Sequence, residues 1–130
     1  MDAIKREALE KVRLPGRVIQ KAVGKESPAQ STQMTVGFAH YSEETGPMEP
    51  HQHVEEAVHI LDVRKGWVRC GPSRDHLGAR VPLEVGMTLH FPENEWHVFE
   101  YDKEGYVDII FYYGQGDMPG YFNRQRSGQK

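Results

Sequence analysis

The sequence predicts an all-β protein, a sandwich or closed barrel of short strands preceded by one short α-helix. From Gly16 onward the apolar residues recur with a period of two, which is the spacing of a strand with one buried face. The segments with this period are short, rich in Val, Ile, Phe and Tyr, and separated by Gly, Pro, Asn, Asp or Ser. Seven or more such strands behind a single helix are typical of a sandwich or a barrel.

The helix comes first, over residues 2–12, where Ile4, Ala8 and Leu9 fall on one stripe at helical spacing. Leu14-Pro15-Gly16 ends it. The strands expected after it are Arg17–Val23, Met34–Tyr41, Glu56–Val63, Trp67–Cys70, Met87–Phe91, Trp96–Tyr101 and Val107–Tyr113. Turns or loops are expected at 24–32, 42–47, 71–78 and 102–105.

A chain of 130 residues is long enough for one domain. We therefore expect a single domain over 1–130, with the helix in 1–13, the barrel in 14–113 and a surface tail in 114–130. The net charge is −3, but residues 1–25 hold seven Lys and Arg against three Asp and Glu. This small excess predicts a solvated face and no nucleic-acid partner, because nucleic-acid footprints are large and one-sided.

Membrane and secretory classes are not expected either. The longest apolar run, Ile109–Tyr113, has five residues, whereas a membrane-spanning helix needs about 20. A single cysteine, Cys70, excludes a disulfide framework, and the N-terminus lacks the apolar stretch of a signal peptide. These features predict a cytoplasmic protein.

Histidine is the residue type that points to a function, with seven in 130 residues. His51 and His53 form a His-x-His pair, and a strand presents both rings on one face because its side chains alternate. A carboxylate follows at once, from Glu55 or Glu56. His97, after a Pro-Glu-Asn-Glu turn, offers a third imidazole. Three imidazoles and a carboxylate suit a divalent Fe, Mn, Ni, Co or Zn ion, whose identity stays open.

The remaining histidines are better explained one by one as packed or exposed residues. They are His40, His59, His76 and His90.

The two histidine segments resemble the two motifs of the cupin superfamily. In the first, Gly46, His51, His53, Glu56 and Gly66 match the residue types of the motif, although each gap between them departs from its spacing. In the second, Gly86, Pro92 and His97 fit the spacing in full. Asn94 stands for the glycine and Tyr101 for the asparagine of that motif.

The resemblance covers roughly residues 14 to 113 and implies a small single-domain jelly-roll barrel with a divalent metal near its mouth. It implies His51, His53, Glu56 and His97 as metal ligands. Cupin strands usually carry an apolar residue five positions after the glutamate, and counting back from Leu61 selects Glu56. Alternation then turns His59 away from the site, and Glu55 remains the rival ligand.

The resemblance also implies a metal-dependent enzyme on a small polar organic molecule, of dioxygenase, isomerase or lyase type; a non-catalytic ligand-binding or regulatory cupin is the alternative. Isomerase or lyase chemistry needs an acid or base beside the ligands, for which Tyr101 and His90 are candidates, together with Tyr41, Glu95 and Tyr113. No nucleophile elbow, phosphate-binding loop or dinucleotide fingerprint supports a hydrolase, kinase or dehydrogenase. An open sheet edge predicts a homodimer.

Overall fold

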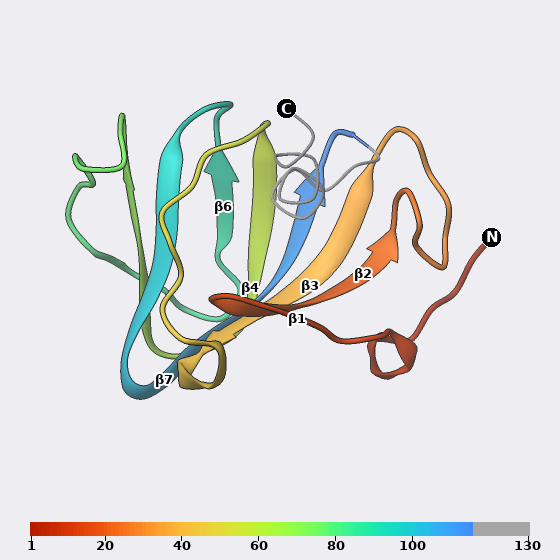
Figure 1. Ribbon diagram of the computed structural model, residues 1–130, viewed down its shortest axis with the longest axis horizontal. Coiled ribbons are helices and arrows are strands. Elements are labelled where there is room, and N and C mark those ends of the chain that lie inside the picture. The colour runs from red at the N-terminus through yellow and green to blue at the C-terminus, as the bar shows by residue number, and fades with distance from the viewer. Residues whose placement is uncertain (116–130) are drawn as a thin grey trace.

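The computed structural model describes residues 1–115, which form seven β-strands and two short 3-10 helices (Figure 1). The elements in chain order are η1 (Arg6–Ala8), β1 (Val12–Leu14), β2 (Arg17–Val23), β3 (Thr35–Ser42), η2 (Glu43–Thr45), β4 (Glu56–Gly71), β5 (Val81–Pro82), β6 (Thr88–Phe91) and β7 (Trp96–Tyr113). This is the β-rich architecture that the alternating pattern predicts. No helix within residues 1–115 is both long enough and apolar enough to cross a membrane.

The strands pair antiparallel in the order β1-β2-β3-β7-β4-β5, and β6 adds to the start of β4. The two long strands β4 and β7 run beside each other from the Glu56–Tyr113 pair to the Gly71–Trp96 pair. Their register shifts twice, between Ile60 and Asp62 and between Arg64 and Gly66. Such irregularities bend a strand, and Figure 1 shows β7 turning at the bottom of the view between its cyan first half and its blue second half.

The bend in β7 lies at residues 102–105, where the sequence predicts a turn. Pairing with β4 stops at Tyr101 and resumes at Tyr106, and Glu104 adopts a φ of 66°. A side chain at Gly105 would lie 2.5 Å from the Arg64 carbonyl oxygen, so the two strands can approach there only because this residue is glycine. The sequence therefore predicts the position of the turn. It predicts four separate strands, however, where the structure has the two long strands β4 and β7.

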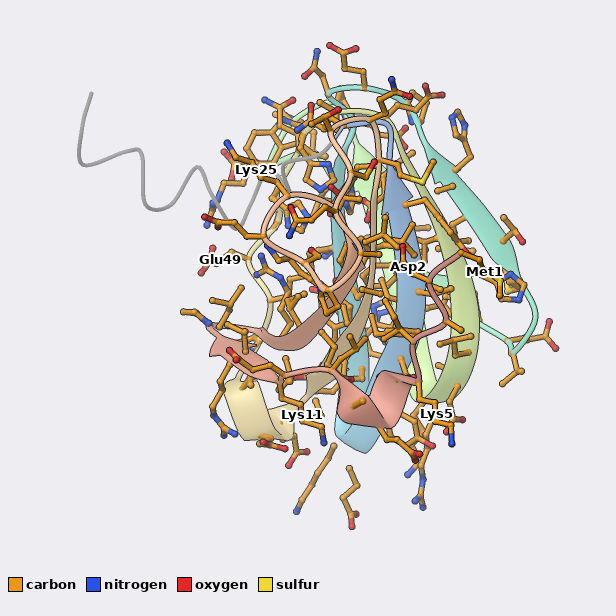
Figure 2. The ribbon with its side chains drawn as sticks, turned by 90° about the vertical axis from the view of Figure 1, so that its right-hand side faces the viewer. Met1, Asp2, Lys5, Lys11, Lys25 and Glu49 are labelled. Carbon is orange, nitrogen blue, oxygen red and sulfur yellow. The ribbon has the colours of Figure 1, made fainter. Side chains whose placement is uncertain are left out.

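The prediction of an N-terminal α-helix over residues 2–12 is wrong, because the only helical element in this segment is the three-residue turn η1. The flanking residues Lys5 and Leu9 are both extended. The Gln20 side-chain amide donates to the carbonyl oxygens of Arg6 and Leu9, and the Leu9 side chain is buried. These contacts to the sheet replace the helical ones, since a helix of about a dozen residues is marginal without tertiary support. Figure 2 shows the segment from Met1 past Lys5 to Lys11 lying across the strands.

The expected closed barrel is also wrong, because the ladder within residues 1–115 ends at β1 on one side and β5 on the other. On the free edge of the first half of β7, the described residues form one isolated bridge, between His51 and His97. The segment that makes this bridge contains Pro47 and Pro50. Proline has no N–H to donate to a ladder, so the segment cannot pair as a regular strand.

The core lies between the inner faces of the bent strands, where Val58, Ile60, Val107 and Ile109 are fully buried. Along β4 burial alternates residue by residue from Glu56 to Ile60. The alternation confirms the register that places Glu56, Val58 and Ile60 on the inner face. The predicted tail lies outside the described residues from residue 116 on, and the homodimer and the cytoplasmic location stay predictions.

Candidate metal site

Three histidines come together where the irregular segment before β4 crosses the start of β7. One ring nitrogen from each of His51, His53 and His97 lies within 4.8 Å of the other two. The bridge between His51 and His97 consists of two backbone hydrogen bonds of 2.9 and 3.1 Å, which hold the two segments at this point. The ring centroids are 4.6 to 5.2 Å apart. The structure thus brings together the three imidazoles that the sequence selects.

Each of the three rings has its Nδ1 atom beside a backbone carbonyl oxygen. The acceptors are Glu49 for His51 at 3.4 Å, Val54 for His53 at 3.1 Å and Glu95 for His97 at 3.1 Å. A carbonyl oxygen only accepts hydrogen bonds, so a neutral ring in this position carries its proton on Nδ1. The Nε2 lone pair of each ring is then left for a metal, with the ring orientation set by the backbone.

Glu56 begins β4 and adds its carboxylate to the same cluster. Its Oε1 atom lies 3.3 Å from Nε2 of His97 and 3.5 Å from Nε2 of His53. The Glu56 side chain is only 5% exposed. Within the described chain, Glu56 Oε1 and His53 Nε2 have no hydrogen-bond partner. Buried acceptors without donors are costly, and a cation between them would satisfy both, so these residues fit a metal ion.

Burial keeps two of the imidazoles in the form that binds metals. The pKa of His51 is lowered to about 2, mainly by burial and next by the neighbouring rings of His97 and His53. Burial also lowers the pKa of His53, although the Glu56 carboxylate opposes the shift. Neutral imidazole is the ligand form of histidine.

Glu55, the rival carboxylate, lies on the outer face of the strand. Its side chain is 69% exposed and pairs with Nε2 of His90 at 2.5 Å. His59 is also on that face, with Nδ1 3.0 Å from the Thr88 hydroxyl. The structure therefore places Glu56 at the histidine cluster and leaves Glu55 and His59 outside it.

The two selected acid or base candidates, Tyr101 and His90, also lie apart from the cluster. The Tyr101 hydroxyl donates to the Gly46 carbonyl oxygen at 3.2 Å, and its ring lines a different cavity beside Phe99 and Trp67. His90 is on the outer face with Glu55. The aromatic residue against the cluster is instead Phe91, which stacks on His97 with centroids 4.0 Å apart and 11° between the planes.

A cavity of about 20 Å³ lies at the cluster, which is the space of roughly one water molecule or ion. It is lined by the four selected residues and by five others, Arg17, Ile19, Tyr41, Phe111 and Tyr113. Tyr41 and Tyr113 were among the acid or base candidates. Arg17 was missed, although its position two residues before the buried Ile19 on β2 indicates an inner-facing side chain.

Tyr113 contacts the cluster through its ring, whose centroid lies 4.9 Å from that of His53 with 84° between the planes. Burial, and next the charge of Glu56, raise the pKa of Tyr113 well above its usual value. The hydroxyl therefore keeps its proton in the cavity that it shares with the Glu56 carboxylate. Burial likewise raises the pKa of Tyr41.

No protein-family model matches the chain, and no curated protein matches it. Solved structures do match, over most of the chain. A protein from Planctomyces limnophilus aligns over 90% of this chain and 91% of its own with a TM-score of 0.69 and 18% identity. Fe(II)-HppE, in complex with the alternative substrate (S)-1-HPP, aligns over 86% of this chain with a TM-score of 0.64 and 13% identity.

Oxalate decarboxylase from Bacillus subtilis, which has Mn(II) centres, aligns over 91% of this chain with a TM-score of 0.67 and 14% identity. The aligned region is 59% of the HppE chain and 30% of the decarboxylase chain. The likeness concerns the fold, and it agrees with the two histidine motifs and the bent antiparallel sheet. The chain has the cupin fold.

Proposed function

We propose that this protein is a metal-dependent enzyme that acts on a small polar organic molecule, with a divalent metal ion held by His51, His53, His97 and Glu56. The observation that carries the proposal is the pair of buried atoms without partners, His53 Nε2 and Glu56 Oε1, inside a cluster of converging ring nitrogens. A buried site with this donor set is costly when empty and satisfied by a cation.

The donor set favours a metal of the later first transition row. Three imidazole nitrogens and one carboxylate oxygen suit Fe, Mn, Co, Ni or Zn, and the thiol of Cys70 is not part of the cluster. The iron of HppE and the manganese of the decarboxylase support this range. When bound, such an ion polarises a substrate oxygen or, as Fe(II), binds dioxygen.

The surrounding residues hold the ligands and supply apolar walls. Backbone carbonyl oxygens fix the proton of each ring on Nδ1. Tyr113 packs against His53 and lines the cavity beside the Glu56 carboxylate, so it supports both ligands. Phe91, stacked on His97, and the buried Phe111 form an apolar wall. Polarisation of a bound oxygen is strongest in such a surrounding of low dielectric constant.

A ligand-binding role without turnover is the second candidate. The observation that favours it is the placement of Tyr101 and His90, because neither acid or base candidate lines the cavity at the histidine cluster. The cavity-lining tyrosines hold their protons tightly, since burial raises their pKa values.

The metal assignment is tested by elemental analysis of protein purified without chelator. We expect about one equivalent of a divalent transition metal per chain, as three or four protein ligands imply. His51→Ala should retain well under half of that content. His59→Ala is the matched control, because this histidine is close in sequence but on the outer face, and it should retain the full content. Equal metal content in the two variants would overturn the assignment.

Nitric oxide separates a catalytic centre from a closed structural one. It is a small neutral ligand, and it adds to Fe(II) only where a coordination position is open. We expect the Fe(II)-loaded protein to give the EPR signal of the nitric oxide adduct. A protein that keeps its iron and gives no signal has a closed site, which contradicts the enzyme proposal. A signal without turnover of small hydroxy acids, diols or sugars favours the second candidate.

A further inference from the structure

Arg17 lies at the metal cavity because of the turn that precedes β2. Gly16 adopts a φ of 87°, and its N–H donates to the Thr45 carbonyl oxygen at 2.9 Å. A side chain at Gly16 would lie 2.9 Å from the Met48 backbone, so the turn packs tightly and requires glycine. The strand that follows has Ile19 on its inner face, and alternation places Arg17 on that face as well.

The cavity opens to solvent at Arg17 and His51. Ile19, Tyr41, Phe111 and the other residues from the strands that line it are buried, whereas Arg17 and His51 are partly exposed. His53 is also partly exposed as a residue, but its side chain is only 5% exposed. A molecule that approaches the histidine cluster therefore passes the guanidinium of Arg17.

Arg17 has no carboxylate partner among the described residues. Its one hydrogen bond there runs from a guanidinium N–H to the Pro15 carbonyl oxygen at 3.4 Å. Four other arginines each pair with an acidic side chain; they are Arg6, Arg13, Arg69 and Arg74. The Arg17 charge still acts on the site, since after the larger effect of burial it contributes to lowering the pKa of His51 and of His53.

The charges at the cavity favour an anion. A divalent ion with one carboxylate ligand leaves one positive charge, and Arg17 adds a second. Partly buried charge of one sign is unfavourable until it is paired. A guanidinium presents two parallel N–H groups that match the two oxygens of a carboxylate or phosphate.

From this geometry we propose that Arg17 selects the ligand of the site: a small molecule with an acidic group, a carboxylate or another oxyanion, which pairs with Arg17 while a second oxygen faces the histidine cluster. The inference rests on the proposed metal site, because the ligand would contact Arg17 with its acidic group and the histidine cluster with a second oxygen. The small cavity also limits the group that reaches the cluster to about the size of one oxygen atom.

The test uses the visible spectrum of the full-length protein loaded with Co(II), titrated with three probes. Glycolate carries a hydroxyl and a carboxylate, ethylene glycol is its neutral counterpart, and inorganic phosphate is the second type of oxyanion. We expect glycolate or phosphate to change the spectrum at concentrations at which ethylene glycol does not. Whichever oxyanion binds more tightly identifies the acidic group.

Three variants separate the role of Arg17 from general charge. Arg17→Gln should weaken binding of the oxyanion by at least about tenfold, because one charge-assisted bidentate pair is lost. Arg17→Lys keeps the positive charge but not the two parallel N–H groups, so its affinity for the oxyanion should lie between those of the wild type and Arg17→Gln. Arg13→Gln is the control, since that arginine is exposed and paired with Glu44, and it should bind as the wild type does. All three should take up Co(II) as the wild type does.

The outcomes distinguish this inference from the proposed function. Arg17→Gln with full Co(II) content and unchanged oxyanion binding overturns the inference and leaves the metal site intact. Equal binding of ethylene glycol and glycolate by the wild type also overturns it. A wild-type protein that takes up no Co(II) overturns the proposed function, and the inference with it.

Discussion

Nε2 of His53 lies 3.5 Å from Oε1 of Glu56, both atoms are buried, and neither has a hydrogen-bond partner within residues 1–115. Because the His53 proton is held on Nδ1 by the Val54 carbonyl oxygen, two acceptor atoms face each other without a donor between them. A metal ion relieves this arrangement, and so does a hydrogen-bond donor at either position. The two cases differ in metal affinity: the acceptor pair binds the ion, whereas a hydrogen-bond donor at either position weakens binding of the ion. This difference can be tested.

Replacement of Glu56 by glutamine should stabilise the metal-free protein and weaken metal binding. The amide can donate to the Nε2 lone pair of His53, and such a bond contributes about 1 kcal/mol to the free energy of unfolding. The loss of the anionic ligand should lower metal affinity about 10- to 100-fold or more, at least as much as the loss of a supporting group. Urea unfolding with a chelator gives the stability, and competition with a chelating dye gives the affinity.

The control for this substitution is Glu55→Gln. Glu55 is the neighbouring, exposed carboxylate on the outer face, so neither quantity should change by more than about 0.5 kcal/mol. If Glu56→Gln destabilises the metal-free protein instead, the Oε1 atom of Glu56 has a donor in the wild type and the cation argument is lost.

Tyr113→Phe should lower metal affinity without removing a ligand. Its protonated hydroxyl is buried in the cavity beside the Glu56 carboxylate, whose charge acts on it, and the loss of a group that supports a metal ligand typically costs about 10- to 100-fold in metal affinity. Tyr112→Phe is the matched control, because Tyr112 is the adjacent residue on β7 and is 43% exposed. Both variants are measured by chelator competition. Equal affinities for the two variants would show that Glu56 is held in place without Tyr113.

The metal-free protein should lose stability as the pH falls below about 6.5, the ordinary pKa of histidine. Burial lowers the pKa of His51 to about 2 in the folded chain, so below pH 6.5 the unfolded chain binds a proton that the folded chain does not. The free energy of unfolding therefore decreases by about 1.4 kcal/mol per pH unit for this ring, and is constant above pH 6.5.

The pH dependence is measured by urea unfolding between pH 5 and pH 8 in the presence of a chelator, with His51→Asn as the reference. The variant should show a shallower slope than the wild type over the lower part of this range. Parallel slopes would mean that His51 is protonated in the folded protein, which contradicts a site built from neutral rings.

The sequence predicts the parts of the site whose spacing is local. His51, His53 and Glu56 lie within six residues. The count back from Leu61, which the cupin resemblance supplies, selects Glu56 over its rival Glu55, and the burial pattern of β4 places Glu56 on the inner face. Arg17 could not be recognised in this way, because its role depends on which face of β2 meets the other strands. The short strands β1 and β5 carry too few residues for a periodic pattern.

The prediction of an N-terminal helix is wrong because residues distant in sequence determine the conformation of this segment. Of the predicted apolar stripe, Leu9 is buried, Ile4 is half-buried and Ala8 is exposed. The conformation is set instead by contacts with residues far along the chain, above all between Arg6 and Asp108, which are 102 positions apart. A local period does not report such distant partners, and tertiary contacts override local propensity.

Arg6→Ala should destabilise the fold and leave the metal site unchanged. The Arg6 guanidinium donates two hydrogen bonds to Asp108, of 2.7 and 2.9 Å, and a third to Gln20 at 3.0 Å. Asp108 is only 10% exposed, and its pKa is lowered because the hydrogen bonds from Arg6 and His40 outweigh its burial. Without Arg6 the nearly buried carboxylate keeps only His40, which should cost about 1–2 kcal/mol after allowance for the partly exposed guanidinium.

Arg13→Ala provides the comparison, because its ion pair with Glu44 is exposed on both sides and should contribute no more than about 1 kcal/mol. The free energy of unfolding from urea titrations at neutral pH separates the two variants. Metal affinity should equal that of the wild type in both, because Asp108 lies on the opposite face of β7 from the fully buried Val107 and Ile109. If Arg6→Ala costs no more than Arg13→Ala, the N-terminal segment is held to the sheet by burial of Leu9 and not by the Arg6–Asp108 pair.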